Sequence, residues 1–196
     1  MMRNVIRALR ATVVLAILTG LVYPLVMTGV AQVAFRGKAD GSLVRADGRT
    51  VGSSLIGQAW TGSKWFYGRP SATATPYDAA SSSGSNLGPL SKTLADQIEE
   101  RVARITDLEG PYHPGLQPSD IPVDLLTASA SGLDPDISPA AAAFQAPRIA
   151  AVRGIPLAVV QRLIDQHTEG RTLGFLGEPR VNVLELNLAL AQMGRG

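Results

Sequence analysis

Residues 57–64, GQAWTGSK, are the part of the sequence that comes nearest to a phosphate-binding loop. In such a loop a lysine directly follows the second glycine and reaches the terminal phosphates, and the serine or threonine after it meets the magnesium ion. Here Ser63 and Lys64 stand in the reverse order, and the bulky Trp60 occupies the middle of the segment. We therefore expect no nucleotide phosphate to bind there.

A serine-rich segment at residues 81–88, SSSGSNLG, offers hydroxyl groups and backbone amides to an anion, or a nucleophilic serine. Its composition describes a flexible surface loop equally well. A serine nucleophile needs a histidine base, but the chain has no G-x-S-x-G elbow, and its histidines are His113 and His167. We expect His167 to pack in the core. A membrane-anchored enzyme acting through Ser85 or His167 is the least favoured hypothesis.

Metal binding has equally little support. The chain has no cysteine, which excludes disulfides and thiolate zinc sites. Asp124, Asp134 and Asp136 could hold calcium in a loop, but the EF-hand spacing is missing and an Asp-Pro pair more often begins a turn. The sequence thus predicts neither a catalytic set nor a resident metal ion.

The elements that position these residues begin with a long apolar segment. Between Arg10 and Arg36 the chain carries no charged side chain, and a helix of about 20 apolar residues crosses a bilayer core. We predict a short cytoplasmic N-terminus over residues 1–10, a transmembrane helix over 11–35 and a soluble domain over 36–196. A cleaved signal sequence is the alternative, but its apolar region usually has roughly 7 to 15 residues.

Basic residues predict the orientation of this span. Three arginines precede it, while the basic residues that follow are spread more thinly. Because positive charge close to a span favours the cytoplasm, we expect a cytoplasmic N-terminus and an exterior domain. Tyr23 and Pro24 are expected to contact a partner helix, since helix breakers in a bilayer are tolerated where neighbouring protein satisfies the backbone.

The charge of the soluble part argues against nucleic-acid binding. The whole chain has a formal net charge of +2 and a pI near 9.2, but the three arginines before the span account for this excess. The basic footprint of a nucleic-acid-binding protein is therefore missing. The remaining chain is long enough for one compact domain with its own core.

Hydrophobic spacing predicts helices in the second half of the soluble domain. Apolar residues recur every three or four positions over residues 90–108, before a stop at Gly110-Pro111. A second helix over 138–154 has a serine cap, an initial proline and a final glycine, and Pro147 must kink or shorten it.

The other segments give less regular patterns. Pro156 opens a third helix that Gly170 is placed to end, and residues 181–193 alternate like a strand but favour a helix. Residues 36–88 predict loops and short strands near 53–57 and 64–67, with aromatic packing anchors at positions 60 and 65–67. The predicted fold class is α+β, with one N-terminal transmembrane helix followed by a single mixed α/β soluble domain.

Several short motifs in a fixed order give information about the family that the composition does not give. They are GRPSA at 68–72, YD at 77–78, SGSNLGP at 83–89, ASGLDPDISP at 130–139, QAPR at 145–148 and GEPRVNV at 177–183. In these motifs, and over nearly its whole length, the chain resembles the C subunit of the bacterial Kdp potassium-transporting ATPase, the KdpC family.

This resemblance implies a non-catalytic accessory subunit of an ATP-driven, high-affinity potassium uptake pump in the bacterial inner membrane. Its partners would be a channel-like potassium-binding subunit, a P-type ATPase subunit and a small single-span subunit, with lipid around the helix. The chain would stabilise the assembled complex. Partner contacts are expected at Tyr23, Pro24, Arg69, Asn86 and Arg180.

The family also suggests a catalytic chaperone that raises the pump's affinity for ATP. Gln145, Arg148 and Ser85 would then be linked to nucleotide, with ATP present at the level of the complex and no firmly bound cofactor. An exterior domain could not reach cytoplasmic ATP, so a structural alternative stays open. Gln145 and Arg148 would bind backbone carbonyls around Pro147, and residues 177–180 would form a turn with a local ion pair. An independent membrane-anchored binding protein is the alternative function.

Overall fold

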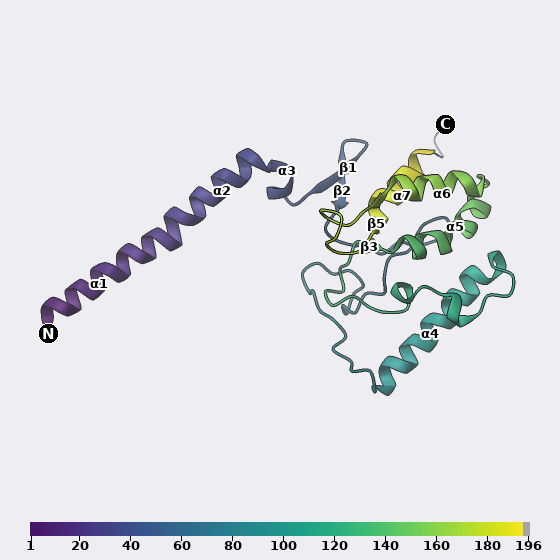
Figure 1. The fold of residues 1–196 in the computed structure, drawn as a ribbon, viewed down its shortest axis with the longest axis horizontal. Coiled ribbons are helices and arrows are strands. Elements are labelled where there is room, and N and C mark those ends of the chain that lie inside the picture. The colour runs from purple at the N-terminus through teal and green to yellow at the C-terminus, as the bar shows by residue number, and fades with distance from the viewer. Residues whose placement is uncertain (194–196) are drawn as a thin grey trace. The chain divides into compact units, whose positions relative to one another are not determined.

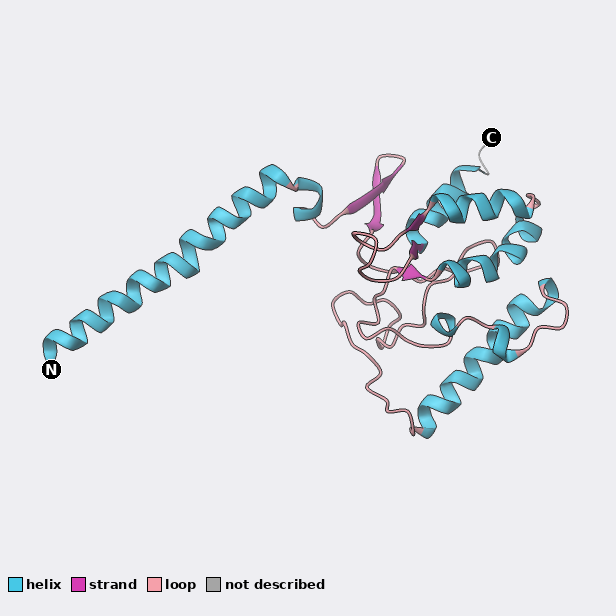
Figure 2. Cartoon of the chain, in the orientation of Figure 1, coloured by secondary structure: helices cyan, strands magenta, loops and turns pink. Residues whose placement is uncertain are grey.

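The structure of the chain is a computed structural model that describes residues 1–193 (Figure 1). The chain divides into two units, Met1–Leu43 and Val44–Gly196. Helices and irregular segments make up most of the described chain, and the strands are short (Figure 2). One N-terminal helix followed by a mixed domain confirms the predicted α+β class.

The N-terminal unit contains α1 (Met2–Ile17), a π-helical turn (Leu18–Val22), α2 (Tyr23–Ala34) and the short α3 (Arg36–Ala39). The continuous span Met2–Ala34, 33 residues, is the one helix within residues 1–193 that is long and apolar enough to cross a membrane. It begins before residue 11, because arginine is a good helix former and nothing earlier interrupts the helix. The chain itself buries none of its side chains.

The π-helical turn lies directly before Pro24. A proline inside a helix lacks a backbone donor, and its ring clashes with the carbonyl four residues earlier, here that of Gly20. A wider π turn relieves such a clash without ending the helix. The Thr19 hydroxyl also donates to the Leu15 carbonyl at 2.7 Å, so side chains take part in satisfying this stretch of backbone.

The soluble unit opens with a small hairpin of β1 (Leu43–Ala46) and β2 (Arg49–Ser53). Its turn residues Asp47 and Gly48 both have positive φ, 49° and 75°, as a two-residue hairpin turn requires. Residues 54–90 then contain no helix or strand. The predicted strands near 53–57 and 64–67 are therefore wrong beyond Ser53, because the backbone groups of this stretch bond to side chains and to single loop residues and not to a neighbouring strand.

Four longer helices follow, and most of their ends match the sequence signals. They are α4 (Lys92–Glu109), α5 (Pro139–Arg153), α6 (Leu157–Gln166) and α7 (Val183–Met193), with single 3-10 turns at Gly110–Tyr112, Pro118–Asp120 and Val123–Leu125. Ser138 caps α5, Gly154 ends it in the left-handed conformation, and Pro147 does not shorten it.

Two helix boundaries were predicted wrongly. The Ser91 hydroxyl caps α4 by accepting from the Leu94 amide at 3.4 Å, so Leu90 lies outside the helix and is 99% exposed. Helix α6 ends at Gln166, with His167 as its cap, and not at Gly170, because the chain enters β4 directly after the cap.

A three-stranded antiparallel sheet has the order β3-β5-β4, with β3 (Asp136–Ile137), β4 (Thr168–Glu169) and β5 (Arg180–Asn182). Ile137 and Thr168 both pair with Val181 of the central strand. Residues 181–193 thus contain both of the elements that their sequence indicates, a strand and a helix. They begin as a strand and continue as α7.

The core of the soluble unit is built around α5. Nearly every face of this helix is buried, and its alanines at positions 141, 142, 146 and 150 let neighbours approach closely. Helix α5 packs on α6, and α6 packs on α7. Phe66, from the irregular segment, is fully buried in the same core, so this segment is held against the helices.

Candidate functional site

Residues 63–67, here called the clamped segment, have no strand partner, and their backbone groups bond to side chains of two distant helices. Buried backbone groups must find partners, because an unpaired one costs about 1–3 kcal/mol. The side chains that hold the segment are Gln145, Arg148 and Arg153 of α5 and Asn187 of α7.

Arg148 is fully buried and ties three parts of the chain together. Its Nε lies 2.8 Å from Oε1 of Glu109, the last residue of α4, and both side chains are at most 2% exposed. Its Nη1 donates to the carbonyls of Ser63 and, at 3.0 Å, Trp65. Burial raises the pKa of Glu109, and the Arg148 charge opposes this shift. The pair replaces water around two charges that the fold has buried.

Two amide side chains exchange hydrogen bonds with the same segment. Gln145 Oε1 accepts from the Tyr67 amide at 2.8 Å, and its Nε2 donates to the Tyr67 carbonyl at 3.1 Å. Asn187 does the same for Phe66, with both distances 2.9 Å. Gln145 and Arg148 therefore bind carbonyls, as the structural alternative expected, but those of residues 63–67 and not those around Pro147.

A cavity of about 500 Å3 lies beside the clamped segment. Residues 58–60, 67–71 and 76–77 line part of it, and α4 contributes Arg101, Ile105 and Glu109. Trp60 Nε1 and Glu109 Oε2 are buried there without a hydrogen-bond partner within residues 1–193. Gln145 and Arg69 both line this cavity, so the structure brings these two predicted residues to one place.

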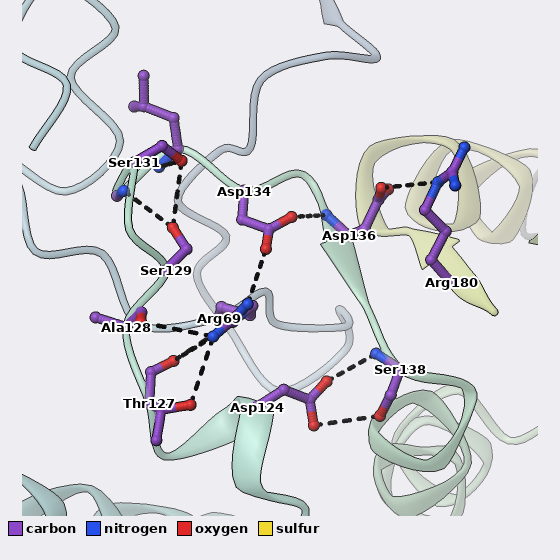
Figure 3. A network of polar contacts seen from close by, with 12 residues as sticks. Arg69, Asp124, Thr127, Ala128, Ser129, Ser131, Asp134, Asp136, Ser138 and Arg180 are labelled. Atoms are coloured by element: carbon purple, nitrogen blue, oxygen red, sulfur yellow. Dashed lines mark hydrogen bonds and ion pairs between the residues drawn. The ribbon is translucent and has the colours of Figure 1, made fainter. Parts of the chain in front are cut away.

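Arg69, which lines the cavity, binds residues of the loop before β3 (Figure 3). Its Nη1 lies 3.0 Å from Asp134 Oδ2, and its other nitrogens point to the carbonyls of Thr127 and Ala128 at 3.4–3.5 Å. The guanidinium is 27% exposed. It therefore ties residue 69 to the loop before β3, and a contact with another subunit at Arg69 stays a prediction.

The three aspartates considered for calcium face different partners (Figure 3). Asp124 accepts from the Ser138 amide at 2.7 Å, Asp134 binds Arg69, and Asp136 pairs with Arg180 at 3.1 Å. Within residues 1–193 no three His, Asp or Glu side chains gather as metal ligands. The aspartates fix turns and strand ends.

Arg180 links two strands of the sheet. Besides Asp136 of β3 it binds Glu169 of β4 at 2.5 Å, while Glu178 pairs with Arg171 at 2.7 Å. The expected local ion pair within residues 177–180 is therefore wrong, because the strand register places Arg180 opposite Glu169.

Tyr77 yields a pH-dependent prediction. Its hydroxyl donates to the Arg69 carbonyl at 2.5 Å, and burial, helped by Asp134 and opposed by Arg69, raises its pKa from 10.0 to about 12. The folded chain keeps this proton where the unfolded chain loses it, so its contribution to stability is complete below about pH 10 and lost as the pH rises towards 12.

We expect Tyr77→Phe to lose part of this alkaline dependence. The measurement is urea unfolding of both proteins at about pH 8 and about pH 11, with tyrosinate absorbance followed in parallel. Wild type should lose more unfolding free energy between the two pH values than the variant does. Equal losses in the two proteins would contradict the assignment.

The serine-rich segment is pinned to the loop before β3. Gly84 lies so close to it that an added Cβ would stand 2.7 Å from the Ala130 carbonyl oxygen, and one on Gly132 would stand 2.7 Å from that of Ser83. The Ser83 amide donates to the Ser131 carbonyl at 3.1 Å. These contacts hold residues 83–84 against residues 130–132, while most of the segment is exposed, as in the surface loop that its composition predicts.

Ser85 and Asn86 follow this contact and are exposed, Asn86 with a positive φ of 52°. Neither lines the cavity, so Ser85 is not beside Gln145 in it. Tyr23 and Pro24 lie in the N-terminal helix, with Tyr23 62% exposed. Roles for these four residues stay predictions.

Sequence reasoning missed Glu109 and Asn187, the two buried polar residues that complete the clamp. Glu109 follows Ile98, Val102 and Ile105 on the apolar stripe of α4, and Asn187 lies between Leu184 and Leu190 on α7. A polar residue in an apolar stripe signals a buried hydrogen bond. That signal gives no partner, because the partners are far away in the sequence.

Comparisons with known proteins bear on the whole chain. The model of the family described as "KdpC: K+-transporting ATPase, c chain" matches residues 5–192. A potassium-transporting ATPase KdpC subunit from Herpetosiphon aurantiacus is 54% identical over 190 residues, covering 95% of this chain and 94% of that protein. The KdpC subunit of Variovorax paradoxus is 56% identical over 191 residues and covers 96% of each.

Proposed function

This chain belongs to the KdpC family, the c chain of the K+-transporting ATPase, and we propose that it is the non-catalytic subunit that stabilises the assembled pump. Its partners would be a channel-like potassium-binding subunit, a P-type ATPase subunit and a small single-span subunit. One observation carries the proposal. Four buried polar side chains bind one another or the clamped segment, namely Glu109, Gln145, Arg148 and Asn187. Such a network would give the domain a rigid surface for contacts with other subunits.

The helix supports the same proposal. Its apolar side chains are exposed along its whole length, which only lipid or other membrane helices can cover. We propose that residues 11–35 lie in the inner membrane, that residues 1–10 are cytoplasmic and that the domain over 36–196 is exterior. Tyr23 and Pro24 would then face a partner helix.

The test is co-purification. The tagged chain is extracted in mild detergent from potassium-starved cells of its host, the proteins that travel with it are identified, and potassium-stimulated ATPase activity is assayed in the same fraction. The proposal requires that large membrane subunits and potassium-stimulated ATPase activity co-purify with the tagged chain. A chain that elutes alone from membranes containing the pump would favour an independent binding protein, for which the cavity beside Glu109 and Trp60 would be the ligand site.

Orientation can be tested directly, because the chain has no cysteine. We expect Ser85→Cys, at an exposed position, to react with a membrane-impermeant maleimide in intact cells. Asn4→Cys, before the span, should react only after the membrane is permeabilised. The reverse pattern would place the domain in the cytoplasm.

A result that places the domain in the cytoplasm would favour the second proposal, a catalytic chaperone that raises the pump's affinity for ATP through Gln145, Arg148 and Ser85. The geometry supports it less. Arg148 is fully buried, and Gln145 Oε1 and Nε2 already bind the Tyr67 backbone. Nucleotide would have to displace contacts that hold the core together.

A further inference from the structure

Strands β4 and β5 form the base of a long hairpin whose far end, residues 173–176, we call the hairpin tip. Thr168 and Glu169 pair with Val181 and Arg180 at its base. Farther out the Arg171–Glu178 ion pair crosses the hairpin at 2.7 Å. Thr172 and Leu176 then exchange two backbone hydrogen bonds of 2.9 Å. The tip therefore has a defined conformation.

The hairpin tip is apolar, and its side chains are exposed. Leu173 is 79% exposed, Phe175 68% and Leu176 50%. Leu173 also has a φ of 55°, in the left-handed region that is unfavourable for a leucine. Neither the exposure nor the strained backbone helps this domain to fold. Adjacent exposed apolar side chains of this kind mark a surface that another molecule covers.

The charges around the hairpin tip favour a protein over a lipid surface. Residues 173–176 carry no charge, and the nearest arginines are neutralised, Arg171 by Glu178 and Arg180 by Asp136 and Glu169. A loop that binds anionic lipid presents unpaired basic residues beside its apolar side chains. Here both flanking arginines are paired with carboxylates, so no unpaired basic group stands beside the tip, which fits an uncharged protein pocket better than anionic lipid.

We propose that the hairpin tip docks into an uncharged apolar pocket on another subunit of the pump. This rests on the proposed function and names the surface through which it acts. Because hydrogen bonds and an ion pair already fix the hairpin, little conformational entropy is lost when it binds. Leu173 and Phe175 would be the anchors, since buried aromatic and aliphatic side chains dominate the binding energy of such contacts.

The test uses the full chain expressed with the other subunits, one of which carries the tag. The variant Leu173→Ser/Phe175→Ser should lower the amount of this chain retained after dilution by about tenfold or more. Its thermal unfolding should match that of wild type, since both side chains are exposed. Leu90→Ser, at an apolar residue that is 99% exposed elsewhere, is the matched control and should retain wild-type binding.

A photo-crosslinking residue in place of Phe175 identifies what covers the tip. A crosslink to another pump subunit supports the proposal, whereas a crosslink to a second copy of this chain or to lipid overturns it. Equal retention of wild type and the double variant also overturns it, while the proposed function stands. Failure of wild type to co-purify overturns both.

Discussion

Replacing Arg148 by alanine is expected to destabilise the soluble domain by about 3–5 kcal/mol. The change leaves Glu109 buried without its cation and removes the donors for the carbonyls of Ser63 and Trp65. Burial raises the pKa of Glu109, and in the variant the Arg148 charge no longer opposes this shift. The variant should therefore lose stability as the pH rises above the ordinary range of a glutamate, more steeply than wild type does.

Tryptophan fluorescence is well placed to follow this unfolding. The two tryptophans, Trp60 and Trp65, lie with ring centroids 5.2 Å apart at the clamped segment. Chemical unfolding of the full chain in detergent gives the free energy. Arg162→Ala, at an exposed arginine of α6, is the control and should change it by less than about 0.5 kcal/mol.

A double variant separates charge from hydrogen bonding. Glu109→Leu/Arg148→Met removes both buried charges, so it should recover part of the loss, while the carbonyls of the clamped segment stay unpaired. A single Arg148→Ala variant as stable as wild type would mean that the buried pair does not hold the segment.

The second large effect is expected for Asn187→Leu. Leucine has nearly the shape of asparagine, so the core keeps its packing, but the amide and carbonyl of Phe66 lose their partners. Two unpaired buried backbone groups should cost about 2–4 kcal/mol together.

The same fluorescence assay measures this loss. Gln161→Leu, the matching change at an exposed position of α6, should have little effect. If Asn187→Leu and Gln161→Leu unfold at the same denaturant concentration, the amide of Asn187 does not hold the clamped segment.

How far the sequence predicts this fold depends on whether the signals are local. Ser138, Pro139 and Gly154 fix α5 within a few residues, and the structure confirms both ends. The irregular stretch over 54–90 has no periodicity, since single residues such as Phe66, Tyr67 and Arg69 bind different partners far away in the sequence. Its aromatic anchors were nevertheless predicted, and Phe66 lies in the core.

In the site, too, the sequence indicates single residues but not their distant partners. Arg148 and Gln145 were singled out by a motif, and the structure places them at the clamped segment, 85 and 78 positions from the backbone groups they bind. Glu109, which the sequence analysis missed, lies on the apolar stripe of α4. Only the folded chain shows that Arg148 is its partner, because no sequence pattern relates two helix faces that meet in space.

The hydrogen bonds that hold the clamped segment also limit when this part of the core can form during synthesis. The bond between Phe66 and Asn187 spans 121 positions, and α7 ends at Met193 in a chain of 196 residues. The clamped segment therefore lacks this partner until the 121 residues that follow Phe66 have been synthesised and α7 can form. A contact between positions this far apart in the sequence forms late in folding, and a variant without α7 would leave the backbone of Phe66 without the side chain that binds it.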